Sequence, residues 1–321
     1  MKILLTGSNG FLGSVLKKKL KCQKIITNDI NIYGKKLDFK KSFSNFEAKK
    51  LKSVEAIIHL AGLSTNYDPP DKIYKKIAFK VNTFNTFDLA KKAKKNGVKK
   101  FIFASSASVY GNFKGKIANE NSVLKPTTSY AISKKKAEEK LLKLSDKNFK
   151  VIIFRMVTLF GYSPRMRFDV LVNNIIANYI QNKAVILKSK GKLIRPQLHV
   201  LDTVQFYQQA IDNENIKSGI INIGRDEYNI NILKIAKLMA KKLKCPLQIG
   251  KEDKDERSYK VSFKKQNKTF SNIIFKGDLA FSFKEIFRNF KQKHNFTKYV
   301  YYNLKTLENL KNKKKIRYLL K

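Results

Sequence analysis

The stretch Lys2-Ile3-Leu4-Leu5-Thr6-Gly7-Ser8-Asn9-Gly10-Phe11-Leu12-Gly13 decides the fold. An apolar run with strand character leads directly into three glycines, after which apolar residues recur at helical spacing. Glycines let the backbone turn tightly and approach a pyrophosphate, and the N-terminus of the following helix offers unpaired N–H groups to that anion. We therefore predict that a dinucleotide binds at Gly7, Asn9, Gly10, Phe11, Leu12 and Gly13.

An acidic residue ends the second predicted strand, which covers residues 24–28. Asp29 lies at the distance from the glycines at which a carboxylate can accept hydrogen bonds from an adenosine ribose. Such a carboxylate repels a 2′-phosphate, so Asp29 favours NAD over NADP. The alternative interpretation is an ordinary turn residue at the end of a strand.

The rest of the N-terminal half repeats this alternation. Apolar runs at residues 2–6, 24–28, 56–60, 100–104 and 151–155 are separated by helical patterns at 11–20, 81–96 and 130–144. Nearly continuous apolar runs are typical of parallel strands buried on both faces. We predict an α/β fold, a Rossmann doubly wound parallel sheet over residues 1–165 with a returning segment at about 200–223. A smaller C-terminal α/β substrate lobe over 166–321 should contain helices at 168–179 and 230–243, and a strand at 220–223 lies in the returning segment.

The formal charge of +44 is the most conspicuous feature of the composition. It suggests a polyanion partner. However, nearly all the basic residues are lysines spread along the whole chain, and arginine, whose planar fork recognises bases and phosphates, is scarce. We interpret the charge as a solvated lysine surface and expect no specific nucleic acid.

The cysteines, the histidines and the length of the apolar runs indicate in which compartment the protein works. Two distant cysteines and three histidines favour neither a disulfide scaffold nor a metal site. No run approaches the roughly 18 to 20 uncharged apolar residues that span a bilayer, and the first run is too short for a signal peptide. We expect a cytoplasmic protein with no membrane span and no metal.

A tyrosine and a lysine stand four residues apart in Tyr130-Ala131-Ile132-Ser133-Lys134, hence on one face of a helix. A phenol with a pKa of about 10 is a poor base at neutral pH, and a nearby cation favours its ionised form. Lys134 is therefore predicted to make Tyr130 a usable acid/base. Upstream, the apolar run at 100–104 leads into a hydroxyl-rich end over residues 105–111, where open parallel sheets place ligands. The alternative interpretation of these hydroxyl groups is a cluster of strand-end caps.

Together with HLAG at 59–62, the Val81-Asn82 pair, SSASVYG at 105–111 and HVLD at 199–202, these motifs resemble the extended short-chain dehydrogenase/reductases, in particular the nucleoside-diphosphate-sugar epimerase family. The resemblance implies a catalytic triad of Ser106, Tyr130 and Lys134. It also implies NAD contacts at Leu60, Ala61, Gly62 and Asn82, and a contact of Asp38 with adenine.

On the substrate side the resemblance implies that Asn174, Arg195 and Arg257, with Arg165 as a weaker candidate, hold a nucleoside-diphosphate sugar. It further implies a homodimer through the helices that follow Val81 and Tyr130. Candidate contacts are Phe84, Phe87, Ile132, Leu141 and Leu142, although packing in the core of the chain explains these apolar residues equally well.

The resemblance leaves the reaction open. Family members share a first step in which the tyrosine removes a hydroxyl proton while a hydride passes to the nicotinamide. Dehydratases and decarboxylases typically carry an acid directly after the catalytic hydroxyl, whereas Ala107 and Ser108 follow Ser106. We therefore expect epimerisation, at carbon 4, through a transient keto-sugar. The alternatives are an NAD(P)H-dependent reductase of a 4-keto-sugar nucleotide and a non-catalytic RNA-binding or scaffold relative.

Overall fold

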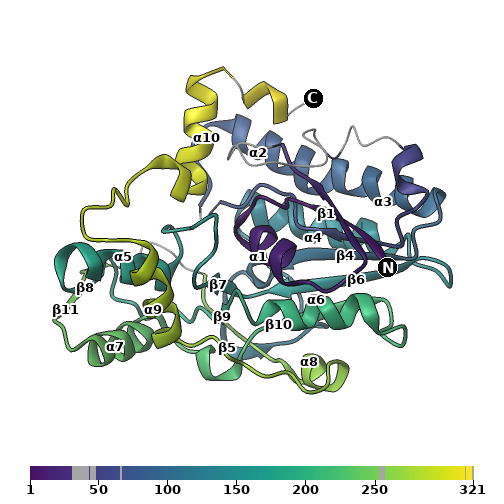
Figure 1. The fold of residues 1–321 in the computed structure, drawn as a ribbon. Helices are drawn as coiled ribbons and strands as arrows, with labels where there is room; N and C mark the ends of the chain where they lie inside the picture. The colour runs from purple at the N-terminus through teal and green to yellow at the C-terminus, as the bar shows by residue number, and fades with distance from the viewer. Residues whose placement is uncertain (31–42, 44–47, 66, 253–256, 315, 320–321) are drawn as a thin grey trace.

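A computed structural model describes residues 1–30, 43, 48–65, 67–252, 257–314 and 316–319 (Figure 1). Its centre is a six-stranded sheet in the order β10-β6-β4-β3-β1-β2, in which every neighbouring pair is parallel. The strands are β1 (Lys2–Thr6), β2 (Lys24–Asn28), β3 (Ala56–His59), β4 (Lys100–Ser106), β6 (Lys150–Met156) and β10 (Gly219–Ile223). The predicted doubly wound α/β fold is confirmed.

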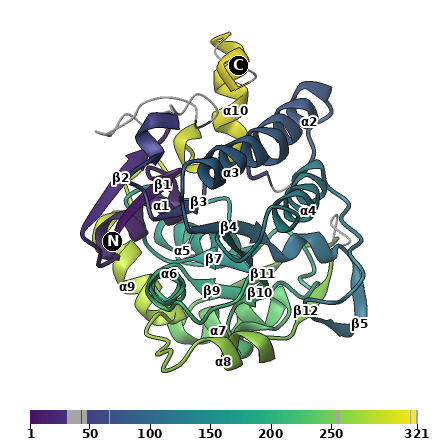
Figure 2. The same ribbon diagram turned by 90° about the vertical axis from the view of Figure 1, so that its right-hand side faces the viewer.

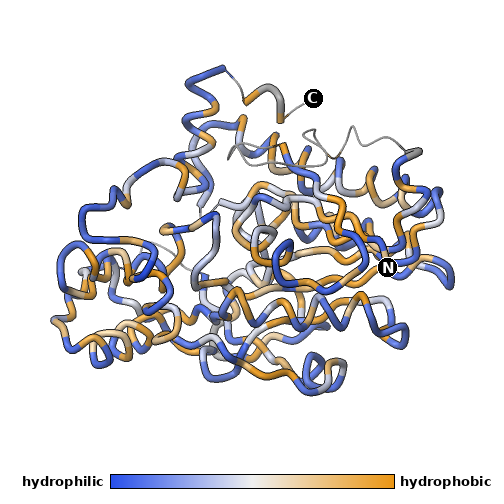
Figure 3. Tube along the Cα trace, in the orientation of Figure 1, coloured by the Kyte–Doolittle hydropathy of each residue, from blue (hydrophilic) through white to orange (hydrophobic). Residues whose placement is uncertain are grey.

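Alternate residues of each strand enter different hydrophobic cores, as the pleat of a strand requires. Ile3 and Leu5 pack on the face covered by α1 (Phe11–Lys19) and α6 (Thr203–Asp212). Leu4, between them, packs on the opposite face, below α3 (Thr86–Lys95) and α4 (Ser129–Leu142). Figure 2 shows these helices on the two sides of the sheet, and Figure 3 shows hydrophobic stretches following the strands.

The helix predicted over residues 81–96 begins earlier than expected. It comprises α2 (Lys72–Phe79), a π-helical segment η3 (Lys80–Asn85) and α3 in uninterrupted succession. The Asp71 side chain caps its start by accepting a hydrogen bond from the Ile73 N–H. A π turn adds a residue and shifts the spacing of apolar positions, which explains why a regular helical pattern identified only the second half.

The second lobe is formed by segments that lie on both sides of β10 in the sequence. Its main helices are α5 (Leu171–Asn182), α7 (Ile232–Leu243) and α9 (Leu279–Asn289), packed around Phe168, Ile176 and Ile235. The helix expected at 168–179 thus begins three residues later, and the one expected at 230–243 begins two residues later. The remaining strands and helices are β5 (Phe113–Ala118), β7 (Thr158–Phe160), β8 (Val185–Leu187), β9 (Gln197–His199), β11 (Leu247–Ile249), β12 (Tyr259–Val261) and α8 (Lys264–Thr269).

The C-terminal segment returns to the first lobe. Helix α10 (Asn303–Asn312) and the short turn η7 (Ile316–Leu319) lie against α2 (Figure 1). Leu307 and Ile316 share a small hydrophobic cluster there with Tyr74 and Ile77. Within the described residues, no helix combines the length and the apolar character needed to cross a bilayer.

Candidate active site

A cavity of about 500 Å³ opens at the carboxyl ends of β1, β3, β4 and β6. Strand β2 lies on one side of β1, and β3, β4, β6 and β10 lie on the other. The strand order therefore reverses at β1, and open parallel sheets bind ligands at such a switch point. Its size is that of a small-molecule site. Fourteen of the predicted site residues line it: Gly7, Gly10, Phe11, Leu12, Gly13, Asp29, Leu60, Ala61, Gly62, Ser106, Tyr130, Lys134, Arg195 and Arg257.

The glycine turn is too closely packed for side chains. Gly7 has a φ of +68°, and a Cβ on it would lie 2.7 Å from the Ala61 backbone nitrogen. A Cβ on Gly13 would lie 2.1 Å from the Gly7 carbonyl oxygen. The turn, the loop after β3 and the start of α1 therefore form a backbone cradle of the kind that accommodates a pyrophosphate.

Asp29 follows β2 at the edge of this cradle. Its carboxylate accepts a hydrogen bond of 3.0 Å from the Asn9 backbone N–H, which ties the acid to the glycine turn. Asn9 itself is buried and does not line the cavity. Asp38 lies outside the described residues. The cradle and Asp29 fit NAD, with the glycines at the pyrophosphate and the carboxylate at the ribose.

Asn82 acts from behind the cavity wall, from the π-helical segment. Its Oδ1 accepts a hydrogen bond from the Leu63 N–H at 2.7 Å, and its Nδ2 donates to the Leu63 carbonyl at 3.0 Å and to the Ser133 hydroxyl at 2.9 Å. A Cβ on Gly62 would lie 2.9 Å from that same Oδ1. Asn82 thus fixes the loop after β3 against α4 and does not line the cavity.

Tyr130 stands in the first turn of α4, whose start Thr128 caps by accepting a hydrogen bond from the Ala131 N–H. Burial raises the pKa of the Tyr130 phenol, while a side-chain hydrogen bond with Ser106, the charge of Arg167 and a side-chain hydrogen bond with Ser64 lower it. Two hydroxyl groups and a guanidinium therefore favour the ionised phenol, against the effect of its burial.

Lys134 is buried one helical turn along. Its Nζ donates to the Ala104 carbonyl at 2.7 Å and lies 4.4 Å from the centroid of the Phe103 ring, but 6.0 Å from that of Tyr130. Burial lowers the pKa of Lys134 to about 7, against the opposing charge of Glu138. In this arrangement Lys134 is directed at the strand end, and the groups that lower the Tyr130 pKa are Ser106, Arg167 and Ser64.

The two serines that end β4 have separate roles. The Ser105 hydroxyl donates to the Glu138 carboxylate, whereas Ser106 accepts hydrogen bonds from the Ser108 N–H at 3.2 Å and from its hydroxyl at 2.9 Å. Of the two serines, only Ser106 lowers the pKa of the Tyr130 phenol. The geometry therefore favours Ser106 as the hydroxyl that meets a substrate.

The substrate side of the cavity is cationic. Arg165, Arg167, Arg195 and Arg257 line it, and with Lys134 they face two lining carboxylates, Asp29 and Asp169. Asp169 is paired with Arg167 through bonds of 2.9 and 3.0 Å. Although burial raises its pKa, the charge of Arg167 holds that pKa below its usual value. The balance of charge suits an anionic ligand such as a diphosphate.

Asn174 is not brought to this surface. Its Nδ2 donates to the Phe168 carbonyl at 3.1 Å, and its Oδ1 accepts a hydrogen bond from Asn178 at 3.1 Å. The preceding Asn173 is buried and bonds the backbone of Gly161 on both sides, at 2.8 and 3.2 Å. The Asn174 side chain is therefore bonded within α5 and to the loop that precedes this helix.

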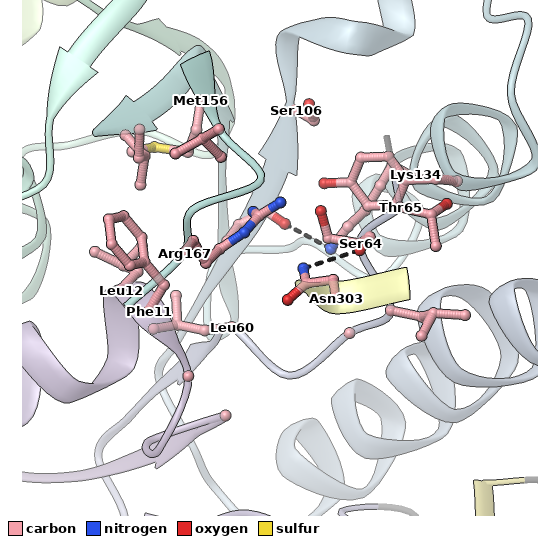
Figure 4. A pocket seen from close by; sticks show the side chains of 18 of the residues that line it. Phe11, Leu12, Leu60, Ser64, Thr65, Ser106, Lys134, Met156, Arg167 and Asn303 are labelled. Carbon is pink, nitrogen blue, oxygen red and sulfur yellow. Dashed lines mark hydrogen bonds between the residues drawn. The ribbon is translucent and has the colours of Figure 1, made fainter. Parts of the chain in front are cut away.

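Several lining residues carry no sequence motif that singled them out. Ser64 and Thr65 follow the HLAG motif, and their position just after the end of a strand is the sequence feature that could have identified them as lining residues. Asn303, Thr306, Leu307 and Leu319 come from the C-terminal segment. Figure 4 shows Asn303 facing Ser64, with Lys134 and Thr65 beyond and Arg167 extending toward them from the other side.

Comparison with known proteins agrees with this geometry. The profile of the "NAD dependent epimerase/dehydratase family" matches residues 3–224. The chain is 32% identical to dTDP-D-glucose 4,6-dehydratase of Dictyostelium discoideum over 74% of its own length and 61% of that protein. It is 26% identical to UDP-glucose 4-epimerase of Bacillus subtilis over 72% of its own length and 77% of that protein. The match thus spans less than two thirds of the Dictyostelium relative.

Solved structures share the fold. UDP-N-acetylglucosamine 4-epimerase from Methanobrevibacter ruminantium M1, in complex with UDP-N-acetylmuramic acid, has a TM-score of 0.78 at 19% identity, over 90% of this chain and 99% of that one. UDP-glucuronic acid 4-epimerase from Bacillus cereus, in complex with NAD, has a TM-score of 0.72 at 22% identity, over 89% of this chain and 94% of that one. Because the profile match extends from β1 through the glycine turn and α4 to β10, this chain belongs to the NAD dependent epimerase/dehydratase family and is an NAD-dependent enzyme.

Proposed function

We propose that the enzyme epimerises a nucleoside-diphosphate sugar at carbon 4 through a transient keto-sugar. The observation that carries this proposal is the position of Tyr130: it lines one cavity together with Ser106 and Ser64, both of which lower the pKa of its phenol, and with four arginines. The same cavity can therefore handle a hydroxyl proton and hold a diphosphate.

The proton moves through the residues at the strand end. Ser106 orients the sugar hydroxyl, and Tyr130 accepts its proton and later returns it. Arg167 favours the ionised phenol by its charge. NAD, when bound, supplies the oxidant that takes a hydride from the sugar carbon and gives it back. Arg195 and Arg257 hold the diphosphate with bidentate hydrogen bonds, which leaves the sugar free to turn.

The acids of the cavity favour epimerisation over elimination. Elimination needs a group that removes a proton from the neighbouring carbon. Of the described residues that line the cavity, Asp29 and Asp169 are the acids. Asp29 bonds the glycine turn and Asp169 is paired with Arg167, so neither is placed as that base. Ala107, directly after Ser106, is fully buried.

The test is product analysis without added reductant. Purified enzyme is incubated with UDP-, GDP-, CDP- and dTDP-sugars, and the epimers are separated by chromatography. Tyr130→Phe should lower the rate about 10²- to 10⁴-fold, the usual contribution of a general acid/base. Tyr179→Phe, on α5 against Phe283 and outside the cavity, is the matched control and should retain the wild-type rate. Turnover of 4-keto-sugars only when NADH or NADPH is supplied would replace this proposal with a reductase.

A further inference from the structure

Asn303, the first residue of α10, lines the cavity and contacts the loop after β3 and the segment that contains Arg165 and Asp169. Its Nδ2 donates to the Ser64 carbonyl at 2.9 Å, and its Oδ1 accepts a hydrogen bond from the Arg165 guanidinium at 2.6 Å. Its backbone N–H donates to the Asp169 carboxylate at 3.2 Å. One side chain therefore links the loop after β3 in the first lobe to the arginine segment of the second, and Figure 4 shows its contact with Ser64.

The Ser64 end of this link contacts the proposed acid/base. Ser64 lines the same cavity as Tyr130 and lowers the pKa of its phenol, and the Ser64 carbonyl is the group that Asn303 holds. The residue before it, Leu63, is held through both its N–H and its carbonyl by Asn82. Two amide side chains, Asn82 from η3 and Asn303 from α10, thus clamp consecutive residues of one loop.

Helix α10 has its own anchorage, independent of Asn303. Leu307 is buried beside Tyr74 and Ile77, and the Lys311 ammonium pairs with the Asp71 carboxylate that caps α2. The Thr306 hydroxyl bonds the carbonyls of Tyr299 and Tyr302, each at 2.9 Å. Removing the Asn303 amide should therefore leave the helix docked and free only the loop.

We propose that Asn303 is a positioning residue, which holds Ser64 against Tyr130 and Arg165 at the rim of the same cavity, so that the C-terminal helix completes the active site. This inference rests on the proposed function of Tyr130 as the acid/base. It assigns a role in the reaction to a residue that lies 239 positions from Ser64 in sequence and beyond the family match, which ends at residue 224.

The experiment compares Asn303→Ala with Asn312→Ala, which changes an exposed asparagine at the other end of the same helix. Asn303→Asp is a second variant, because it keeps an acceptor for Arg165 but loses the donor to Ser64. Hydrogen exchange of the amides of residues 63–65 is measured on the purified proteins. Exchange should rise about fivefold in both Asn303 variants, the factor that corresponds to one hydrogen bond worth about 1 kcal/mol, and stay unchanged in Asn312→Ala.

The second readout is the pH dependence of kcat for the epimerisation. Because the Ser64 hydrogen bond lowers the Tyr130 pKa, Ser64→Ala and Asn303→Ala should each move the profile toward higher pH. The double variant should move it no further, since both changes act through the same contact. Purely structural damage would lower kcat at all pH values without moving the profile.

The two hypotheses fail differently. An Asn303→Ala enzyme with unchanged exchange at residues 63–65, or with a pH shift that adds to that of Ser64→Ala, would overturn the positioning role. If the wild-type enzyme turns over no sugar nucleotide, the proposed function fails, yet the exchange comparison still decides whether Asn303 holds the loop.

Discussion

The Glu138 carboxylate and the Arg155 guanidinium form a buried ion pair beside the carboxyl end of β4. Arg155 donates to Glu138 at 2.8 Å through Nη2 and at 3.2 Å through Nε, and their side chains are 3% and 2% exposed. Glu138 also accepts the hydroxyl of Ser105, the neighbour of Ser106, and lies one helical turn after Lys134. One carboxylate thus joins α4, β4 and β6 beneath the site.

Glu138→Gln should destabilise the fold strongly. The substitution leaves the Arg155 charge buried without its counter-ion, and breaking such a pair costs about 3 to 5 kcal/mol. The neighbouring Glu139 is 57% exposed and lies 3.9 Å from Lys135, so Glu139→Gln should cost about 0.5 kcal/mol or less. Urea unfolding of the two variants gives both values. Equal losses would show that the buried pair is not a structural support.

Gly7→Ala should affect stability more than a substitution at another glycine with positive φ. Gly7 and Gly97 have φ values of +68° and +80°, so an alanine at either is strained by about 1 to 2 kcal/mol. At Gly97 nothing lies within 4 Å of an added Cβ, whereas at Gly7 the Ala61 backbone lies 2.7 Å away. Gly7→Ala should therefore show the larger fall in melting temperature, and it should also weaken NADH binding, measured by fluorescence. NADH binding as tight as that of the wild type would argue against the cradle.

The sequence predicted the parts of this site that lie close together along the chain. Residues 2–6 and 24–28 form strands with the predicted ends, because an apolar run followed by Gly7 or Asp29 marks its own boundary. Strand β4 was expected to stop at Ala104 but continues to Ser106. Strands are recognised in a sequence by their apolar residues. The last two residues of β4 are serines, so the apolar pattern ends before the strand does.

Contacts between distant segments could not be predicted in this way. Arg155 turns inward to Glu138 and does not line the cavity, and no local pattern of the sequence reports that pairing. Leu141, a candidate dimer contact, is fully buried in the core of its own chain. Asn303 reaches the site only because α10 folds back onto α2, and no local pattern reports that path.

The buried Lys134 should make stability rise with pH. Its pKa is about 7 in the folded chain, and about 10.4 is the ordinary value expected after unfolding. Above pH 7 the unfolded chain therefore binds more protons than the folded one, and the free energy of unfolding increases until the pH reaches the unfolded value. Urea unfolding at pH 7, 8 and 9 should show this rise, and Lys134→Met should flatten it. Parallel curves for the two proteins would mean that Lys134 is not buried in this way.

Phe84 should control the oligomeric state. The enzyme is proposed to form a homodimer through η3, α3 and α4, which lie side by side (Figure 2), and Phe84 on η3 is 51% exposed. Phe84→Asp would place a carboxylate in that interface and weaken the dimer by about 2 kcal/mol, or roughly 30-fold in dissociation constant. Val123→Asp changes another apolar side chain, 70% exposed and outside these helices, and should leave association unchanged. Sedimentation velocity at micromolar concentration distinguishes the outcomes, and a wild-type monomer would refute the dimer.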